Sequence, residues 1–396
     1  MIIKHARLLA QLSEGFASDS ADIRIEGERI AEISAIPLMA QPDEIVLDAA
    51  GKTVLPGLLD IHLHFSVSGN DLNEDNAKTV PKRTLEAYSF ALKTLQAGFT
   101  TVRDVGDVDS AGIVIRDAVE AGRLIGPRIK ASGRILTPTE AGNQYFAGMY
   151  DECNSPDEVR GACRRRFKEG SDFIKVMASG AISNPSGVPG MTIETEEELR
   201  EMVHCANMRG TYVAAHCHGA ESVALCMRTG VRCIEHGTIL SDAIIEELKK
   251  ENSYIIPTLL CTTRMQQTTA KFADFMVKKL DGIVEQRDYW LKKAYKAGIK
   301  LGFGTDAGTT DNWHGENAQE FIERHRLIGM KPIDILCQAT CNSAEIIGLL
   351  DQIGTICVGK FADLVIVDGK PDEQIEQMRD GICAVIKGGT VVRSSL

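Results

Sequence analysis

Apolar residues follow two different periods along the chain, and the change from one to the other divides the chain into three stretches. Short segments with the period of two that is typical of strands lie near the N-terminus, at Ile2–Leu9, Asp22–Ile25, Arg29–Ile33 and Glu44–Asp48. The same pattern returns near the C-terminus, at Ala362–Asp368, Ile382–Lys387 and Thr390–Arg393. We therefore predict one small β-sandwich-like domain built from both ends, residues 1–55 and 352–396.

Between these ends, short apolar segments alternate with amphipathic helices from Gly57 onward. Such alternation is the signature of βα units and of a parallel sheet. The predicted strands end near His62, Arg103, Arg134, Lys175, His216, His236, Pro257 and Thr305. Eight units of this kind close a barrel. We predict an α/β fold in which residues 56–351 form a (β/α)8 TIM barrel that carries the catalytic site.

One helix and two loops refine this picture. Thr195 and Glu198 have the spacing of a capping box, and Gly210 is placed to end the helix that they begin. The loops Leu136–Pro156 and Ser179–Thr195, after the third and fourth strands, exceed the usual length. Long loops in a compact domain are often lids or binding loops, and we expect that role here.

Composition excludes several classes of partner. The net charge of −11 and the absence of a Lys/Arg stripe argue against nucleic acid, which binds clustered cations, so we expect a small-molecule substrate. No apolar run reaches about 18 residues, so no membrane association is expected. The N-terminal MIIKHARLLA lacks the apolar region and cleavage site of a signal peptide.

The eleven cysteines form no CxxC motif, and several lie in helical or apolar patterns where a free thiol packs, among them Cys163, Cys205, Cys226 and Cys337. This usage is typical of a reducing compartment, and we expect a cytoplasmic protein.

The chemistry is concentrated where the predicted strands end. His62 and His64 form an HxH pair at the end of the first strand, and alternation along a strand points both imidazoles to the same side. His216, His236 and Asp306 end the fifth, sixth and eighth strands, at the face where barrels carry their active sites. A single histidine there could be a hydrogen-bonded core residue, but the set as a whole indicates metal ligands.

Lys175 interrupts the apolar strand DFIKVMASG. A buried ammonium loses its hydration unless it is neutralised or paired, so Lys175 is either ion-paired to a carboxylate or carbamylated by CO2. A carbamate would bridge two divalent cations, and its charge, with those of Asp306 and a bridging hydroxide, would offset most of theirs. That hydroxide would attack a polarised carbonyl, and Asp306 would accept its proton and pass it to the leaving group.

The segments PGLLDIHLHF, AGFTTVRDVG, FIKVMASG, AAHCHG, IEHG, GFGTDAG and GKFADLVIVDG resemble the amidohydrolase superfamily, in the branch of imidazolonepropionase-like enzymes that includes Xaa-Pro dipeptidases and zinc carboxypeptidases. The resemblance implies a barrel with a flanking β domain, two divalent metal ions, and a homo-oligomer. It assigns His62, His64 and Asp306 to the more buried metal and His216 and His236 to the more exposed one, with carbamylated Lys175 between them.

Substrate contacts are predicted at other positions. His218, two residues beyond His216, is expected to bind substrate, to stabilise the oxyanion or to make a supporting hydrogen bond. The loop TPTEAGNQYF lacks the GGH motif of the resembling dipeptidases and has Asn143 near that position, so Asn143 or Tyr145 is expected to contact the substrate. Arg103 would pair with a substrate carboxylate or with Asp104, and His314 is a further candidate.

The sequence leaves several functions open. The main hypothesis is a hydrolase of a dipeptide or an N-acyl amino acid, and the second is a carboxyl- or phosphonate-ester hydrolase that uses the same site. A cyclic-amide hydrolase or deaminase is a weaker alternative, because deaminases usually hold one metal ion and Lys175 argues for two. A non-catalytic barrel is weaker still, because every ligand position is filled. Histidine and carboxylate ligands suit Zn²⁺, Mn²⁺ and Fe²⁺, of which we expect zinc.

Overall fold

The computed structural model describes residues 1–396 except 183–184, 186, 189 and 251–252. The chain forms two compact units. One comprises Met1–Asp60, Leu92–Thr101 and Gly315–Leu396, and the other comprises Ile61–Ala91 and Val102–His314. Strands β6 and β7 and helix α2 pass from one unit into the other. The domain boundaries that the sequence suggests, after residues 55 and 351, stay a prediction.

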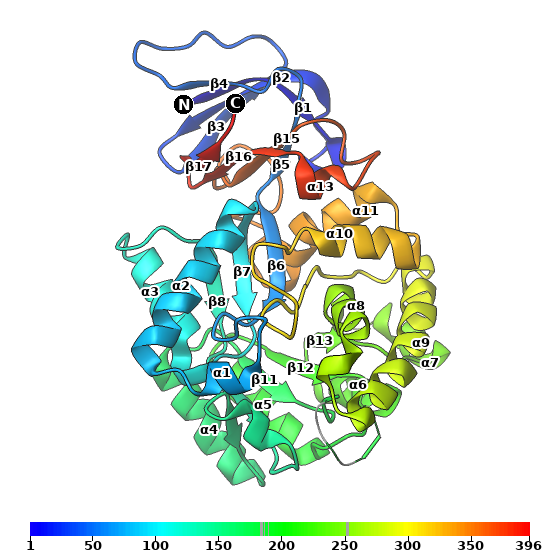
Figure 1. The fold of residues 1–396 in the computed structure, drawn as a ribbon. Helices are drawn as coiled ribbons and strands as arrows, with labels where there is room; N and C mark the ends of the chain where they lie inside the picture. The colour runs from blue at the N-terminus through cyan, green and yellow to red at the C-terminus, as the bar shows by residue number, and fades with distance from the viewer. Residues whose placement is uncertain (183–184, 186, 189, 251–252) are drawn as a thin grey trace. The chain divides into compact units, whose positions relative to one another are not determined.

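The first unit contains an eight-stranded sheet with the order β17-β16-β15-β5-β1-β2-β3, in which β4 also pairs with β1. Figure 1 shows that the blue and red ends of the chain share this sheet. Its strands are β1 (Ile2–Leu8), β2 (Ser18–Glu26), β3 (Arg29–Ser34), β4 (Val46–Asp48), β5 (Thr53–Pro56), β15 (Leu364–Val367), β16 (Ile382–Lys387) and β17 (Thr390–Ser394). The strands predicted at both ends of the chain are therefore confirmed.

A buried apolar cluster explains why these distant segments pair. It combines residues of the N-terminal strands, such as Ile3 and Ile23, with C-terminal residues such as Leu364 and Ile386. Alternation along each strand directs these side chains to the same face of the sheet, where they are removed from water.

The barrel fold is also confirmed. Its strands are β6 (Leu58–Leu63), β7 (Phe99–Asp104), β8 (Arg128–Ala131), β9 (Ile135–Thr137), β11 (Ile174–Met177), β12 (Val213–Cys217), β13 (Cys233–His236) and β14 (Tyr254–Ile256). Two sheets contain them, in the orders β6-β7-β8 and β10-β9-β11-β12-β13-β14. The third barrel strand is thus split: β8 pairs with β7, and β9 pairs with β11. Parallel strands buried on both faces are expected to be continuously apolar, and β11 and β14 are largely so.

The predicted eighth strand is irregular, yet it closes the barrel. The amide of Gly302 donates to the Ile255 carbonyl at 2.9 Å, on the side of the seventh strand. On the other side the amide of Ile61, in the first strand, donates to the Phe303 carbonyl at 2.8 Å. The backbone of this segment therefore links the last barrel strand to the first.

The helices alternate with the strands, as the sequence predicts. They are α1 (Leu72–Asn76), α2 (Val80–Gln96), α3 (Ala111–Glu120), α4 (Pro156–Glu169), α5 (Glu196–Asn207), α6 (Ala220–Thr229), α7 (Asp242–Leu248), α8 (Leu259–Gln267), α9 (Asp274–Lys296), α10 (Gln319–Glu323), α11 (Pro332–Cys337), α12 (Ser343–Ile346) and α13 (Gln377–Asp380). The capping box of Thr195 and Glu198 is confirmed at the start of α5. The loop after the third strand contains an additional strand, β10 (Tyr150–Glu152).

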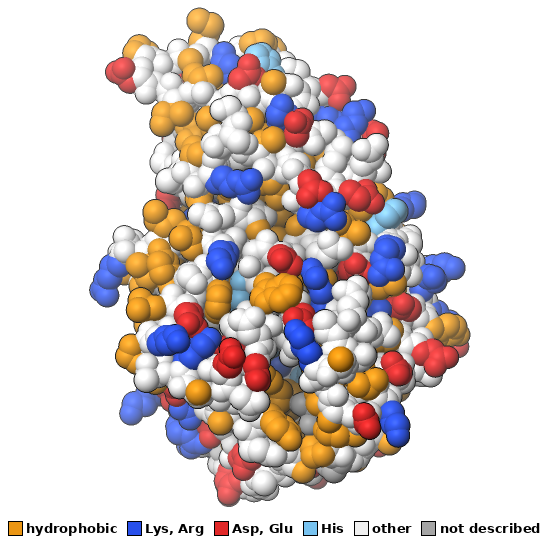
Figure 2. All heavy atoms as spheres, in the orientation of Figure 1, with side chains coloured by type: hydrophobic (Ala, Val, Ile, Leu, Met, Phe, Trp, Pro, Cys, Tyr) orange, Lys and Arg blue, Asp and Glu red, His pale blue; other side chains and the backbone are white. Residues whose placement is uncertain are grey.

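Three general properties bear on the expectations above. All eleven cysteines are free thiols. None of the helices within the described part of the chain has both the length and the apolar character that a membrane span needs. On the face shown in Figure 2, Lys and Arg side chains are interspersed with Asp and Glu.

The closure of the barrel yields a prediction. A Cβ atom added at Gly304 would lie 2.6 Å from the Cβ of His62 and 2.8 Å from Cγ2 of Ile256. Both contacts are too short, and a Cβ cannot rotate away, so Gly304→Ala should lower the free energy of unfolding by about 1–3 kcal/mol. Thermal and denaturant unfolding would measure this decrease in the free energy of unfolding.

Gly282→Ala is the matched control. Gly282 lies within helix α9, and an added Cβ would meet nothing within 4 Å. Since alanine favours a helix over glycine, this substitution should raise stability by about 0.5–1 kcal/mol. Equal effects of the two substitutions would contradict the tight closure at Gly304.

Candidate metal centre

Two groups of side chains at the ends of the barrel strands could each hold a metal ion. The first consists of His62 and His64, which lie at the end of β6, and Asp306. The Nε2 atoms of His62 and His64 lie 3.5 and 3.3 Å from Oδ1 of Asp306. Nδ1 of His64 is hydrogen-bonded to the Gly106 carbonyl at 2.6 Å, so Nδ1 carries the proton and Nε2 faces the carboxylate. Two imidazoles and a carboxylate are a typical donor set for a divalent cation.

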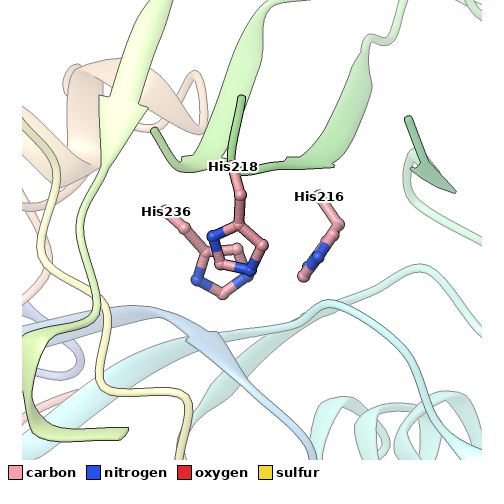
Figure 3. Close-up of side chains that lie close together, drawn as sticks. All are labelled: His216, His218 and His236. Atoms are coloured by element: carbon pink, nitrogen blue, oxygen red, sulfur yellow. The ribbon is translucent and has the colours of Figure 1, made fainter. Parts of the chain in front are cut away.

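The second group consists of His216, His218 and His236, shown in Figure 3. Their ring centroids lie 4.5–4.8 Å apart. Nδ1 of His218 is hydrogen-bonded to the Thr238 hydroxyl and Nδ1 of His236 to the Thr258 hydroxyl, each at 2.8 Å. Nε2 of His216 is buried and has no hydrogen-bond partner among the described residues. A buried nitrogen of this kind is costly unless a ligand satisfies it, so a metal ion fits this group.

Burial keeps four of these imidazoles neutral. It lowers the pKa of His62 and of His218 to about 4 and holds the pKa values of His216 and His236 well below the usual range. Because only the neutral ring can bind a metal ion, the barrel interior maintains the ligand form of these side chains at neutral pH.

The charge of Lys175 acts on side chains of both ligand groups. Its side chain projects from β11 and is 2% exposed. Burial lowers the pKa of its amine to about 8, against the opposing influence of Glu235. Its charge in turn helps to lower the pKa of His62 in one group and of His216 in the other.

Glu235 is a functional residue that the sequence analysis did not single out. Its carboxylate accepts a hydrogen bond from Nη2 of Arg103 at 2.6 Å and lies 2.6 Å from Nδ1 of His62. Burial alone would raise the pKa of Glu235, but Arg103 and His62 together lower it to about 2. The ionised carboxylate fixes the ring of His62 with Nε2 directed at Asp306. The available signal was an acidic residue within the apolar strand CIEH.

Arg103 does not pair with Asp104, and that prediction is wrong. Its guanidinium is fully buried and donates to Glu235 and to the Ile61 carbonyl at 2.6 Å. Adjacent residues on a strand point to opposite faces, and Asp104 instead accepts from the amide of Phe65 at 3.1 Å. The geometry favours a positioning role for Arg103 over the predicted contact with a substrate carboxylate.

The structure places Asn143 and Tyr145 in the loop after the third strand, outside both ligand groups. Nδ2 of Asn143 donates to the Pro138 carbonyl at 3.0 Å and to Glu152 at 2.7 Å. Tyr145 is 44% exposed. Their contact with substrate stays a prediction.

His314 is buried beside the barrel mouth. Its Nε2 lies 3.0 Å from the Val67 carbonyl, and its ring stacks on Phe90 with centroids 4.8 Å apart. These contacts give the ring a packing role, and its predicted contact with substrate is not tested by them.

Two of the predicted ligands have a left-handed backbone. His236 has φ 67° and Asp306 has φ 60°. Such conformations cost of order 1–3 kcal/mol for residues other than glycine and occur where the surrounding structure enforces them. Here the amide of Asp306 donates to the His62 carbonyl at 2.7 Å, which fixes the two residues relative to each other.

Comparison with known proteins identifies the family of this chain. The amidohydrolase family matches residues 53–392. An ochratoxinase from Aspergillus niger is 26% identical over 380 residues, which cover 86% of this chain and 75% of the relative. A crystal structure of a Xaa-Pro dipeptidase with bound methionine has a TM-score of 0.90 and 31% identity over 98% of both chains. A prolidase solved with N-methylphosphonate-L-proline has a TM-score of 0.90 and 30% identity, covering 100% of this chain and 99% of that one.

The role of Glu235 can be tested by Glu235→Gln. Loss of its charge weakens the hold on His62, so the affinity for metal should fall about 10- to 100-fold, as measured by competition with a chelator. It also leaves the Arg103 charge uncompensated, which should cost about 3–5 kcal/mol of stability.

Two further variants separate these effects. Glu197→Gln, at an exposed position of α5, should change neither quantity. Glu235→Gln combined with Arg103→Met removes both buried charges and should recover stability without recovering metal affinity. Unchanged metal affinity in both Glu235 variants would show that the carboxylate does not support the site.

Proposed function

Since the chain belongs to the amidohydrolase family and is a hydrolase, we propose that it cleaves an amide-type bond in a dipeptide or an N-acyl amino acid with the help of two divalent metal ions. The family generally uses divalent metals, and relatives named as dipeptidase, prolidase and enamidase support the choice of an amide bond. The observation that carries the proposal is Lys175, buried and electrostatically close to both ligand groups.

A buried lysine of this kind is suited to carbamylation. Its pKa of about 8 leaves an appreciable fraction of neutral amine near neutral pH. The neutral amine adds to CO2: a new N–C bond forms, one proton leaves the nitrogen, and the side chain acquires a carboxylate. That change replaces a buried cation by an anion, which two cations beside it would stabilise.

In this proposal His62, His64 and Asp306 hold one cation, His216 and His236 hold the other, and the carbamate of Lys175 serves both. We propose Zn²⁺, which imidazole and carboxylate ligands suit. When bound, two such ions supply a water that ionises near neutral pH and polarise the scissile carbonyl.

Asp306 is the proposed proton carrier. Burial alone would raise its pKa, but His62 and His64 more than offset that and hold the pKa below the usual range. The carboxylate is therefore ionised at neutral pH and can accept the proton that the attacking water loses. It then delivers this proton to the leaving nitrogen, which needs it to depart as an amine.

His218 is proposed to bind the substrate. Its pKa of about 4 keeps the ring neutral at neutral pH. With the Thr238 hydroxyl donating to Nδ1, the proton is on Nε2, and Nε2 can donate to the substrate carbonyl oxygen as negative charge develops there.

The test is elemental analysis of the purified protein and of Lys175→Ala, with both screened against N-acetyl amino acids, dipeptides and simple esters. The parent should hold about two metal ions per chain and hydrolyse amides, and Lys175→Ala should lose both properties because the group shared by the two cations is gone. Lys168→Ala, at an exposed position of α4, is the matched control and should behave like the parent.

Two results would contradict the proposal in different ways. One metal ion or none per chain, unchanged in Lys175→Ala, would make Lys175 an ion-pair partner and end the two-metal hypothesis. If the protein hydrolysed esters and no amide, the proposed metal site would stand, but the proposed amide hydrolysis would be wrong.

A further inference from the structure

A cluster of apolar side chains lies beyond the metal-ligand groups, on the side of the first four strands. We call it the apolar wall. It consists of the buried residues Val67, Val108, Ile135, Met149 and Met177, and of the partly buried Leu72, Phe146, Tyr150, Ala181 and Ile193. All of them belong to the unit that contains the metal-ligand groups.

Two observations place the apolar wall beside the candidate metal centre. Met177 follows Lys175 by two positions on β11, so the two side chains project from the same face of the strand. Ile135 lies against Gly106, where an added Cβ would be 2.4 Å from its Cδ1 and 3.6 Å from Cε1 of His64. Met177 and Ile135 are therefore the members of the apolar wall that lie next to the candidate metal centre.

Tyr150 adds a polar atom to the apolar wall. It is the first residue of β10, which pairs with β9 so that Tyr150 lies opposite Ile135. Its ring stacks on Phe146 with centroids 4.9 Å apart. The structure gives its hydroxyl no hydrogen bond to any described residue, and the side chains clustered around its ring are apolar.

The Asp306 carboxylate acts electrostatically on the phenol of Tyr150. Burial and the Asp306 carboxylate raise the pKa of the phenol, so Tyr150 stays a neutral hydrogen-bond donor at any physiological pH. A neutral donor without a partner among the described residues, on the strand position paired with Ile135, is suited to a substrate oxygen.

We propose that Tyr150 and the apolar wall recognise the substrate: the hydroxyl donates to the oxygen of the scissile carbonyl, and the wall packs against a bulky apolar group attached to the amide. This inference rests on the proposed function and narrows it to amides with an aromatic or branched aliphatic substituent. It also replaces Asn143, whose amide group is already hydrogen-bonded, as the main polar contact from the loop after the third strand.

The first test uses the metal-loaded enzyme and Tyr150→Phe. Loss of a donor to the reacting carbonyl should lower kcat roughly 100-fold on every substrate. The melting temperature should not fall, because the hydroxyl has no described partner to lose. Tyr289→Phe, at an exposed position of α9, is the matched control and should retain full activity. An unchanged kcat in Tyr150→Phe, or a larger loss in Tyr145→Phe, would overturn the assignment of Tyr150.

The second test compares N-acetylglycine with N-acetyl-L-phenylalanine and N-benzoylglycine. At least one bulky substrate should have a kcat/KM roughly 10- to 200-fold above that of N-acetylglycine, and Leu72→Ala should reduce this ratio. Equal kcat/KM values would overturn the apolar wall as a recognition surface while leaving amide hydrolysis intact.

The binding of hydroxamates tests the apolar wall without any need for catalytic turnover. Benzohydroxamate should bind the metal-loaded enzyme roughly 10-fold or more tightly than acetohydroxamate, by about the factor that an apolar contact contributes. If no amide is hydrolysed, the proposed function fails, and this comparison still tests the apolar wall. Equal affinities of the two hydroxamates would overturn it.

Discussion

The barrel interior contains four charged side chains that have almost no contact with water: Arg103, Lys175, Glu235 and Asp306. Each buried charge must be paired, because an isolated one would cost several kcal/mol. Glu235 satisfies this constraint for Arg103 and also orients His62. The same carboxylate acts on Lys175, so the two cations and two anions form one balanced set. The geometry of the ligands depends on this balance.

The balance also explains how the site can accept metal ions. Burial lowers the pKa values of His62, His216, His218 and His236, and the two buried cations offset the two buried anions. The proposed conversion of Lys175 from ammonium to carbamate would change its charge by two units and would favour the binding of cations by the two ligand groups. Lys175 is thus the member of this set whose charge changes sign in the proposal.

Most members of the two candidate ligand groups could be predicted from the sequence, because parallel strands in a barrel end at the same face. The period of two along β6 and the strand-end positions of His216, His236 and Asp306 locate those side chains without any knowledge of the loops. Glu235 could not be identified in the same way, since its role depends on an arginine 132 positions away in the chain.

The loop after the third strand was harder to predict for a different physical reason. It forms an additional strand, β10, whose pairing with β9 determines which side chains face the interior. Because of that pairing, we propose Tyr150 as the substrate contact in place of Asn143 and Tyr145. The eighth strand was predicted near Thr305, but its irregular backbone pairing with the first strand is not visible in any apolar period.

The most direct test of this account is the state of Lys175 itself. The metal-loaded protein, prepared with ¹³C-labelled bicarbonate, can be examined by ¹³C NMR, with Lys175→Ala prepared in the same way. The account predicts one carbamate resonance in the parent, absent from the variant and lost when a chelator removes the metal ions. A protein that holds two metal ions and shows no carbamate resonance would contradict the central role given to Lys175.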